Sequence, residues 1–131
     1  MRTLLLLIAA FLVFGGVVDT NAQTEETVRI TLGQRKTADR GRITIVFRSV
    51  LEDSRCPMNA RCVWAGNAKI RISVSKGRSR PQIIELNSGT EPRVVSAFGY
   101  EFELVDLRPQ KGDPRPIRKQ TAIVSVKKSG R

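Results

Sequence analysis

The sequence predicts an all-β domain, a sandwich or a partly closed barrel built from about seven short strands. Residues 68–74 and 100–104 alternate apolar with polar side chains, which is typical of half-buried strands. Clusters of Gly, Pro, Asn and Ser separate such runs and indicate turns. No stretch after residue 22 keeps the 3.6-residue periodicity of an amphipathic helix, so we expect no helix in the folded domain.

The first 22 residues have the layout of a helical secretory signal peptide. Arg2 supplies the positive charge, residues 4–14 are an unbroken apolar run, and Ala22 ends a small-residue cleavage site. The alternative is an uncleaved membrane anchor. Even when extended to Val18, the run is shorter than the roughly 20 residues that span a bilayer, so we favour cleavage.

Residues 23–131 are expected to form a single β domain with a basic C-terminal end. A signal peptide implies a secreted or periplasmic location, where the oxidising environment favours disulfides. The net charge is +11, and it is unchanged by cleavage because Arg2 and Asp19 cancel. A charge of this size favours contact with anionic surfaces or polymers.

The chain from residue 23 begins with one predicted strand between two polar segments. Residues 23–27 are polar and are expected to fray. Residues 28–32 alternate and predict a half-buried strand, which Gly33 ends. Residues 34–41 are polar and charged and are expected to form a loop.

Two runs, 43–51 and 68–74, predict buried strands of the domain. The inward positions are Ile43, Ile45 and Phe47 in the first run, and Ala68, Ile70, Ile72 and Val74 in the second. The outward positions of the second run are Lys69, Arg71 and Ser73.

Four further runs complete the predicted set of strands. They cover residues 82–86, 93–97, 100–107 and 121–126. Between the last two, residues 109–116 contain three prolines and one glycine and predict a loop.

Cys56 and Cys62 are the only cysteines, and in an exported chain we expect them to form a disulfide. Pro57 and Asn59 between them favour the turn that such a short ring needs. A thiol–disulfide redox site would need Cys-x-x-Cys at the start of a helix, whereas here five residues separate the cysteines and no helix is predicted. A copper(I) site using both cysteines and Met58 is a further alternative, and it requires both thiols to stay reduced.

The same ring is a candidate recognition loop, with Arg55, Pro57 and Arg61 as its recognition residues. A loop closed by a disulfide is preorganised and loses little entropy on binding. Arg61 could then occupy the pocket of a protein partner such as a protease. This predicts a secreted inhibitor as the alternative function.

Two residues after the ring are expected to be structural. Trp64, the only tryptophan, is predicted to pack on the disulfide as a core residue. Gly66 is predicted to mark a bulge or a close backbone approach before the strand that starts at Ala68.

The chain contains no histidine, which removes Ser–His–Asp and Cys–His nucleophiles and the commonest zinc ligand. Glu101 and Glu103 lie about 6.5–7 Å apart on one strand face, a spacing that invites comparison with glycosidases. Two carboxylates on one strand do not flank a substrate, so we expect them to face water or a basic strand. We therefore predict a non-enzymatic protein with no metal and no cofactor.

Positive charge gathers in the last quarter of the chain, where residues 108–131 hold eight lysines and arginines against Asp113 alone. No aromatic residue accompanies them, which argues against nucleic acid as the partner. We expect an anionic envelope surface instead. The candidate polyanion contacts are Arg115, Arg118, Lys119, Lys127 and Lys128.

Residues 53–57 (DSRCP) and 62–68 (CVWAGNA) resemble the motif of a family of small exported bacterial proteins and lipoproteins of unknown function. Residues 46–50, 99–109 and 121–126 are similar to the family's other strands. The resemblance implies an all-β fold and an exported location, and it implies no activity.

The chain departs from that family in two places. Residues 120–122 read Gln-Thr-Ala where the family pattern has an aspartate–tyrosine pair, and no lipid-attachment cysteine follows the apolar run. The sequence as a whole predicts an exported, non-enzymatic binding or structural domain of the envelope. A secreted inhibitor is the alternative, and a copper(I)-binding protein is a third.

Overall fold

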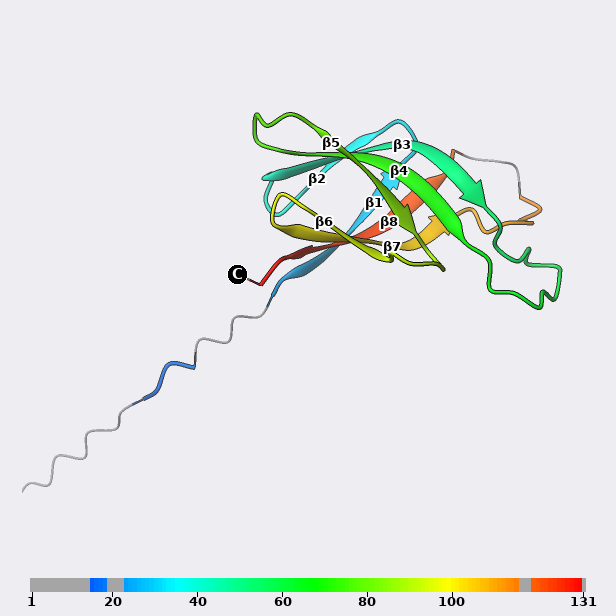
Figure 1. Ribbon diagram of the computed structural model, residues 1–131, viewed down its shortest axis with the longest axis horizontal. Helices are drawn as coiled ribbons and strands as arrows, with labels where there is room; N and C mark the ends of the chain where they lie inside the picture. Colours follow the sequence, from blue (N-terminus) through cyan, green and yellow to red (C-terminus); the bar gives the residue numbers. More distant parts are fainter. Residues whose placement is uncertain (1–14, 19–22, 116–118, 131) are drawn as a thin grey trace, which may run out of the picture.

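The computed structural model describes residues 15–18, 23–115 and 119–130. Within these ranges the chain forms eight strands and no helix, which confirms the all-β prediction. The strands form two four-stranded antiparallel sheets that face one another as a sandwich and do not close into a barrel (Figure 1). The first sheet has the order β1 (Glu25–Thr31), β8 (Thr121–Lys128), β7 (Tyr100–Arg108), β6 (Val94–Ala97), and the second β2 (Arg35–Ala38), β3 (Ile43–Asp53), β4 (Ala68–Lys76), β5 (Gln82–Asn87).

The core lies between the two sheets and is built from alternate residues of the central strands. Every residue predicted to face inward in 43–51 and 68–74 has a fully buried side chain, as do Phe102, Leu104 and Leu107 of β7. Burial of this apolar area is the main term that stabilises the fold, at about 25 cal/mol per Å².

One residue predicted to face solvent is buried. Ser73 of β4 points away from the core but retains only 4% of its exposure. It lies between Val46 of β3 and Ile83 of β5 in the sheet register. A small side chain flanked by two larger ones on neighbouring strands is shielded from water without reaching the core.

The predicted loop at residues 34–41 contains a strand that the sequence did not reveal. Residues Arg35–Ala38 form β2 and pair with β3, with Ala38 opposite Ile43. Only Ala38 of the four is buried, so no alternation of apolar residues marks this edge strand. Its order comes from backbone hydrogen bonds to β3.

The segment predicted to fray is also partly ordered. Glu25, Glu26 and Thr27 belong to β1 and pair with Lys127, Val126 and Ser125. β8 runs two residues beyond its predicted end, and this extension supplies Lys127, the partner of the first residue of β1.

β7 carries a bulge between Leu104 and Asp106. The extra residue, Val105, is 55% exposed, whereas Leu107 is fully buried. Because side chains alternate with a period of two, one inserted residue is needed to return Leu107 to the core face after the bulge.

The sandwich has two different ends (Figure 1). We call the end with the tight turns 39–42, 77–81 and 98–99 the turn end. The other we call the loop end. It carries loop 54–67 between β3 and β4 and the connection between β7 and β8, of which residues 109–115 and 119–120 are described. The two candidate sites lie at these opposite ends.

Most of the predicted signal peptide, residues 1–14 and 19–22, lies outside the described residues. Of its described part, Val17 and Val18 are almost fully exposed. Among the described residues, no helix has the length and apolar character needed to cross a membrane.

Candidate functional sites

The predicted disulfide is confirmed at the loop end. Cys56 and Cys62 are bonded, and their Cα atoms are 5.8 Å apart. This separation lies within the usual range for disulfides. The bond closes a ring inside loop 54–67 and uses both sulfurs that a copper(I) site would need in reduced form.

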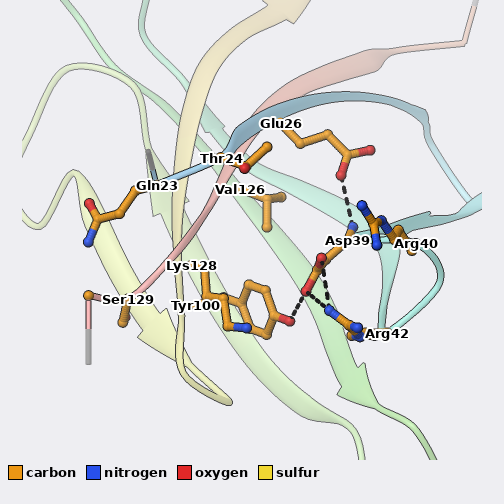
Figure 2. A pocket seen from close by; sticks show the side chains of 11 residues that line it. Gln23, Thr24, Glu26, Asp39, Arg40, Arg42, Tyr100, Val126, Lys128 and Ser129 are labelled. Carbon is orange, nitrogen blue, oxygen red and sulfur yellow. Dashed lines mark hydrogen bonds and ion pairs between the residues drawn. The ribbon is translucent and has the colours of Figure 1, made fainter. Parts of the chain in front are cut away.

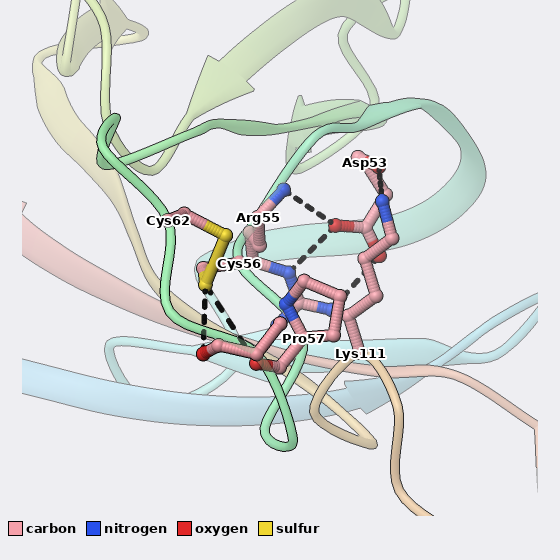
Figure 3. The surroundings of a disulfide bond; sticks show 7 residues. Asp53, Arg55, Cys56, Pro57, Cys62 and Lys111 are labelled. Carbon is pink, nitrogen blue, oxygen red and sulfur yellow. Dashed lines mark hydrogen bonds and ion pairs between the residues drawn. A yellow bond between two sulfur atoms is a disulfide. The ribbon is translucent and has the colours of Figure 1, made fainter.

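Arg55, predicted as a recognition residue, is instead held inside the structure (Figure 3). Its Nε lies 2.8 Å from Asp53 Oδ1 and its Nη2 lies 2.9 Å from Asp53 Oδ2. The same guanidinium donates to the backbone carbonyls of Leu107 and Pro109. Only 16% of the side chain is exposed, so Arg55 joins the end of β3 to the end of β7 and is not free to meet a partner.

The electrostatics of this pair follow from the geometry. Hydrogen bonds from Arg55 are the largest influence on Asp53 and lower the pKa of its carboxyl, against the opposing effect of burial. Hydrogen bonding to Asp53 in turn raises the pKa of Arg55. Both groups are therefore charged throughout the physiological range.

Lys111, in the segment 109–115 that follows β7, lies beside the disulfide ring (Figure 3). Lys111 Nζ donates to the carbonyl of Asp53 at 2.9 Å, and the amide of Met58 donates to the carbonyl of Lys111 at 2.9 Å. These bonds hold the ring against the neighbouring loop. Pro57 is half-buried there, whereas Arg61 is exposed.

Gly66 meets the prediction of a close backbone approach. Its φ is +70°, and a Cβ at this position would lie 2.2 Å from the carbonyl oxygen of Ser54. Ser54 also accepts a hydrogen bond from the amide of Asn67 through its Oγ, at 2.9 Å. Residue 54 at the start of the loop and residues 66–67 at its end are therefore in direct contact.

The prediction that Trp64 is a core residue is wrong. Its side chain is 62% exposed, and Val63 and Met58 are 96% and 57% exposed. The physical reason is that polar contacts of Arg55, Ser54 and Lys111 fasten the loop to the sandwich. The fold therefore needs no apolar anchor at this position.

The second site is an open hollow of about 870 Å³ at the turn end (Figure 2). The turn 39–42, the start of β1, Tyr100 of β7 and the end of β8 all contribute to its wall. Its lining residues are Gln23, Thr24, Glu26, Asp39, Arg40, Arg42, Tyr100, Val126, Lys128, Ser129 and Gly130.

Asp39 organises one wall of this hollow (Figure 2). Its carboxylate accepts a hydrogen bond from the hydroxyl of Tyr100 and lies 3.5 Å from Arg42 Nη1, and its amide donates to Glu26. The bond from Tyr100 is the largest cause of the lowered pKa of Asp39 and raises the pKa of Tyr100. The carboxylate is therefore ionised while Tyr100 remains a neutral donor.

The backbone of the turn is unusual at the same place. Asp39 and Arg40 both have positive φ angles, 48° and 57°, and Gly41 follows at 84°. Residues other than glycine adopt this region rarely and at a cost of about 1–2 kcal/mol. The contacts of Asp39 hold the turn in a shape that presents Arg40 and Arg42 at the hollow.

Cations outnumber acids at the turn end. Lys76 Nζ lies over the ring of Tyr100, 5.8 Å from its centroid. The amide of Gly77, in the turn that carries Arg78 and Arg80, donates to the carbonyl of Arg42 at 3.4 Å. The exposed cations of this end are Arg40, Arg42, Lys76, Arg78, Arg80 and Lys128. Its acids include Glu25, Glu26 and Asp39, which already accept hydrogen bonds.

The five predicted polyanion contacts do not form one surface. Lys119 and Lys128 lie at opposite ends of β8, whose eight residues span about 24 Å. Arg115, at the loop end, is paired with Asp113, and its hydrogen bonds lower the pKa of Asp113 to about 2. Lys127 lies between Glu25 and Glu101 in the register, and Arg118 lies outside the described residues.

The paired glutamates of β7 face basic neighbours, as predicted. Glu103 lies 3.3 Å from Arg93 in an exposed ion pair, and Glu101 lies opposite Lys127. Within the described part of the chain, no group of three or more histidine, cysteine, aspartate or glutamate side chains is arranged to hold a metal ion.

The sequence reasoning missed Arg40, Arg42, Lys76 and the hollow itself. The sequence did offer one signal: in both 40–42 and 76–80, cations flank a glycine, a pattern typical of an exposed, positively charged turn. Their meeting at one end depends on which turns lie together, and that is a property of strand order.

The fold and its sites define an eight-stranded antiparallel β-sandwich with a disulfide-closed loop at one end and a cationic hollow at the other. Comparisons with known protein families, with curated proteins and with solved structures found no match.

Proposed function

We propose that this chain is an exported, non-enzymatic module that binds an anionic polymer of the cell envelope through its turn end. The observation that carries the proposal is the gathering of six exposed cations at the turn end, from three separate segments of the chain. Three of them, Arg40, Arg42 and Lys128, line the hollow. Clustered charge of one sign raises the local concentration of a ligand of the opposite sign. The ligand is defined by its repeated phosphate, sulfate or carboxylate groups.

Nucleic acid is a poorer fit to this surface. Single-stranded nucleic acid is bound through exposed aromatic side chains on which bases stack. At the turn end the described aromatic residues are Tyr100, which is buried, and Phe98, which is half-buried. The one exposed tryptophan lies at the opposite end of the sandwich.

The exported location is part of the same proposal. It is supported by the signal-like segment at residues 1–22 and by the disulfide, which is typical of oxidising compartments. The similarity of the motif around the cysteines to small exported bacterial proteins agrees with it. Fractionation of cells that express the full chain tests the location, and recovery of the uncleaved chain in the cytoplasm would contradict it.

Chromatography on heparin, a sulfated polysaccharide, tests the polymer contact. We expect the chain from Gln23 onward to elute only at salt well above the physiological ~0.15 M. A variant with Arg40→Gln, Arg78→Gln and Lys128→Gln should elute at clearly lower salt. None of these three cations has an ion-pair partner among the described residues.

The matched control removes the same charge elsewhere. Arg29→Gln, Arg48→Gln and Lys119→Gln change three exposed cations away from the hollow. Elution of the two triple variants at the same salt would show that bulk charge alone drives retention, and it would contradict a site at the turn end. Elution of the unaltered chain below physiological salt would contradict polymer binding altogether.

A secreted inhibitor is the alternative function, and one observation favours it: Arg61 is exposed on a ring closed by a disulfide. Arg55 is occupied by structural contacts, which leaves Pro57 and Arg61 as its recognition residues. Incubation with trypsin-like proteases decides the matter. Rapid cleavage after Arg61 without loss of protease activity would rule the inhibitor out.

A further inference from the structure

Three large apolar side chains are exposed on the disulfide ring and directly after it. We define the tip as Met58, Arg61, Val63 and Trp64; Val63 is 96% exposed, Trp64 62% and Met58 57%. Between residues 58 and 65 the only charged residue is Arg61, and there is no acidic residue. The three apolar side chains fall within seven positions of one disulfide-closed loop, and a concentration of exposed apolar residues marks a contact surface more often than scattered ones do.

The tip is held outward by the fold. The disulfide closes the ring, the amide of Met58 bonds to the carbonyl of Lys111, and Gly66 packs its backbone against Ser54. These contacts prevent the loop from folding back to bury Trp64. A loop fixed in this way loses little entropy when it binds.

We propose that the tip inserts into the interface of an anionic lipid bilayer. Tryptophan is enriched at this depth because its ring is apolar while its N–H can still meet the headgroups. Arginine can extend its guanidinium to the headgroups while its stem lies along the apolar side chains. Trp64, Val63 and Met58 are thus the inserted residues, and Arg61 is the residue that meets the lipid phosphates.

The charges around the tip suit an anionic surface. Three acidic groups of the loop end are paired with arginines: Asp53 with Arg55, Asp106 with Arg108, and Asp113 with Arg115. Glu52 and Glu91 are exposed at the same end and are in no ion pair among the described residues, but Arg61, Lys69, Lys111 and Lys119 outnumber them. Arg61 and Lys119 are exposed, and neither has an acidic partner among the described residues. Each cation near an anionic bilayer adds to the attraction.

The size of the tip favours a lipid surface over a protein partner. A stable protein interface uses about 20–30 residues on each side. The run from 58 to 65 offers seven exposed residues, a number suited to shallow, reversible insertion helped by charge. This site is independent of the polymer site, because it lies at the other end of the sandwich (Figure 1).

The only tryptophan of the chain reports directly on insertion. The test uses the chain from Gln23 onward, which contains every residue of the core and lacks the apolar N-terminal run. With vesicles of phosphatidylcholine and phosphatidylglycerol in equal parts, we expect the emission of Trp64 to shift to the blue and acrylamide quenching to fall at least twofold. Vesicles of phosphatidylcholine alone should give a much smaller change.

Val63→Ser should weaken co-sedimentation with the anionic vesicles at least threefold. The matched control is Val105→Ser, an equally conservative change at an exposed valine on β7, and it should bind as the unaltered chain does. Absence of any blue shift and of co-sedimentation would overturn the proposal. So would unchanged binding of Val63→Ser, which would mean that charge alone acts.

The alternative to a lipid bilayer is a second copy of this chain that binds to the tip. Sedimentation velocity without lipid should give a monomer over the whole concentration range. A dimer that Val63→Ser dissociates would overturn the lipid assignment in favour of self-association. Retention on heparin is measured separately, so the failure of either proposal leaves the other standing.

Discussion

The guanidinium of Arg55 lies side-on against the carboxylate of Asp53, two residues earlier in the chain, with Nε 2.8 Å from Oδ1. The same group donates to the carbonyls of Leu107 and Pro109, which belong to the other sheet and to the loop that follows it. One side chain therefore aligns its own loop and fastens that loop across the sandwich. Loss of this guanidinium would leave two carbonyls and a half-buried carboxylate without their donor.

Replacing Arg55 should destabilise the fold more than its position in a loop suggests. We expect Arg55→Ala to lower the free energy of unfolding by about 2 kcal/mol, because hydrogen bonds to charged groups contribute roughly 1.5–3 kcal/mol. Urea unfolding followed by circular dichroism measures the change. The control is Arg71→Ala, which breaks an exposed ion pair with Glu85 and should cost within about 0.5 kcal/mol. Equal costs for the two variants would refute the structural role of Arg55.

The disulfide should stabilise its own loop without being required for the fold. Cys56 and Cys62 close a ring of roughly seven residues, and the chain-entropy estimate for this length is about 2–2.5 kcal/mol. The double variant Cys56→Ser/Cys62→Ser should lose about this much stability and still fold, because the whole core lies on the strands. Thermal unfolding of the unaltered chain with and without reductant provides an independent comparison. A midpoint insensitive to both treatments would contradict the prediction.

Gly66 should be the least replaceable of the glycines with positive φ. In Gly66→Ala the new Cβ meets the Ser54 carbonyl oxygen at 2.2 Å, whereas in Gly33→Ala it meets no atom within 4 Å. Both glycines have positive φ, so both variants carry a backbone cost of about 1–2 kcal/mol. The difference between them isolates the collision, and we expect Gly66→Ala to cost at least ~2 kcal/mol more by urea unfolding. Similar stability of the two variants would show that the approach of the two backbones is not constrained.

Tyr100 is the only tyrosine, so its ionisation can be followed by absorbance without interference. We expect its pKa to lie above the ordinary 10.0, because its hydroxyl donates to the Asp39 carboxylate. In Asp39→Asn the charged acceptor is lost and the midpoint should fall toward 10.0. The chain unfolded in urea supplies the unperturbed reference. A midpoint that does not respond to Asp39→Asn would refute the hydrogen bond.

The same pair makes stability depend on pH at both extremes. The pKa of Asp39 is lowered on folding, so its contribution is present above its ordinary value of 3.8 and is lost as the pH falls through the folded pKa. The pKa of Tyr100 is raised, so its contribution is present below 10.0 and is lost as the pH rises through the folded pKa. Tyr100→Phe should weaken both dependences, and unfolding curves at acid, neutral and alkaline pH measure them. An unaltered pH profile in Tyr100→Phe would count against the pair.

Much of the fold could be predicted because a strand reveals itself through neighbouring residues. Ile43, Ile45 and Phe47 are spaced two residues apart, and a period of two places them on one face whatever the rest of the chain does. The pairing of Cys56 with Cys62 was equally local, since six positions separate them. The close approach at Gly66 was signalled by the glycine itself.

The cationic surface, the edge strand β2 and the exposure of Trp64 depend on the tertiary structure and could not be predicted from the sequence. Arg40, Lys76 and Lys128 come from three segments, and they meet only because antiparallel pairing brings their turns to one end. β2 is ordered by hydrogen bonds to β3, and Trp64 is exposed because polar contacts from distant residues hold its loop. The sequence by itself determined which side chains of the central strands face the core, because the spacing of apolar residues is a property of neighbouring positions. The tertiary structure alone decided which charges share a surface, because that depends on backbone hydrogen bonds between residues far apart in the chain.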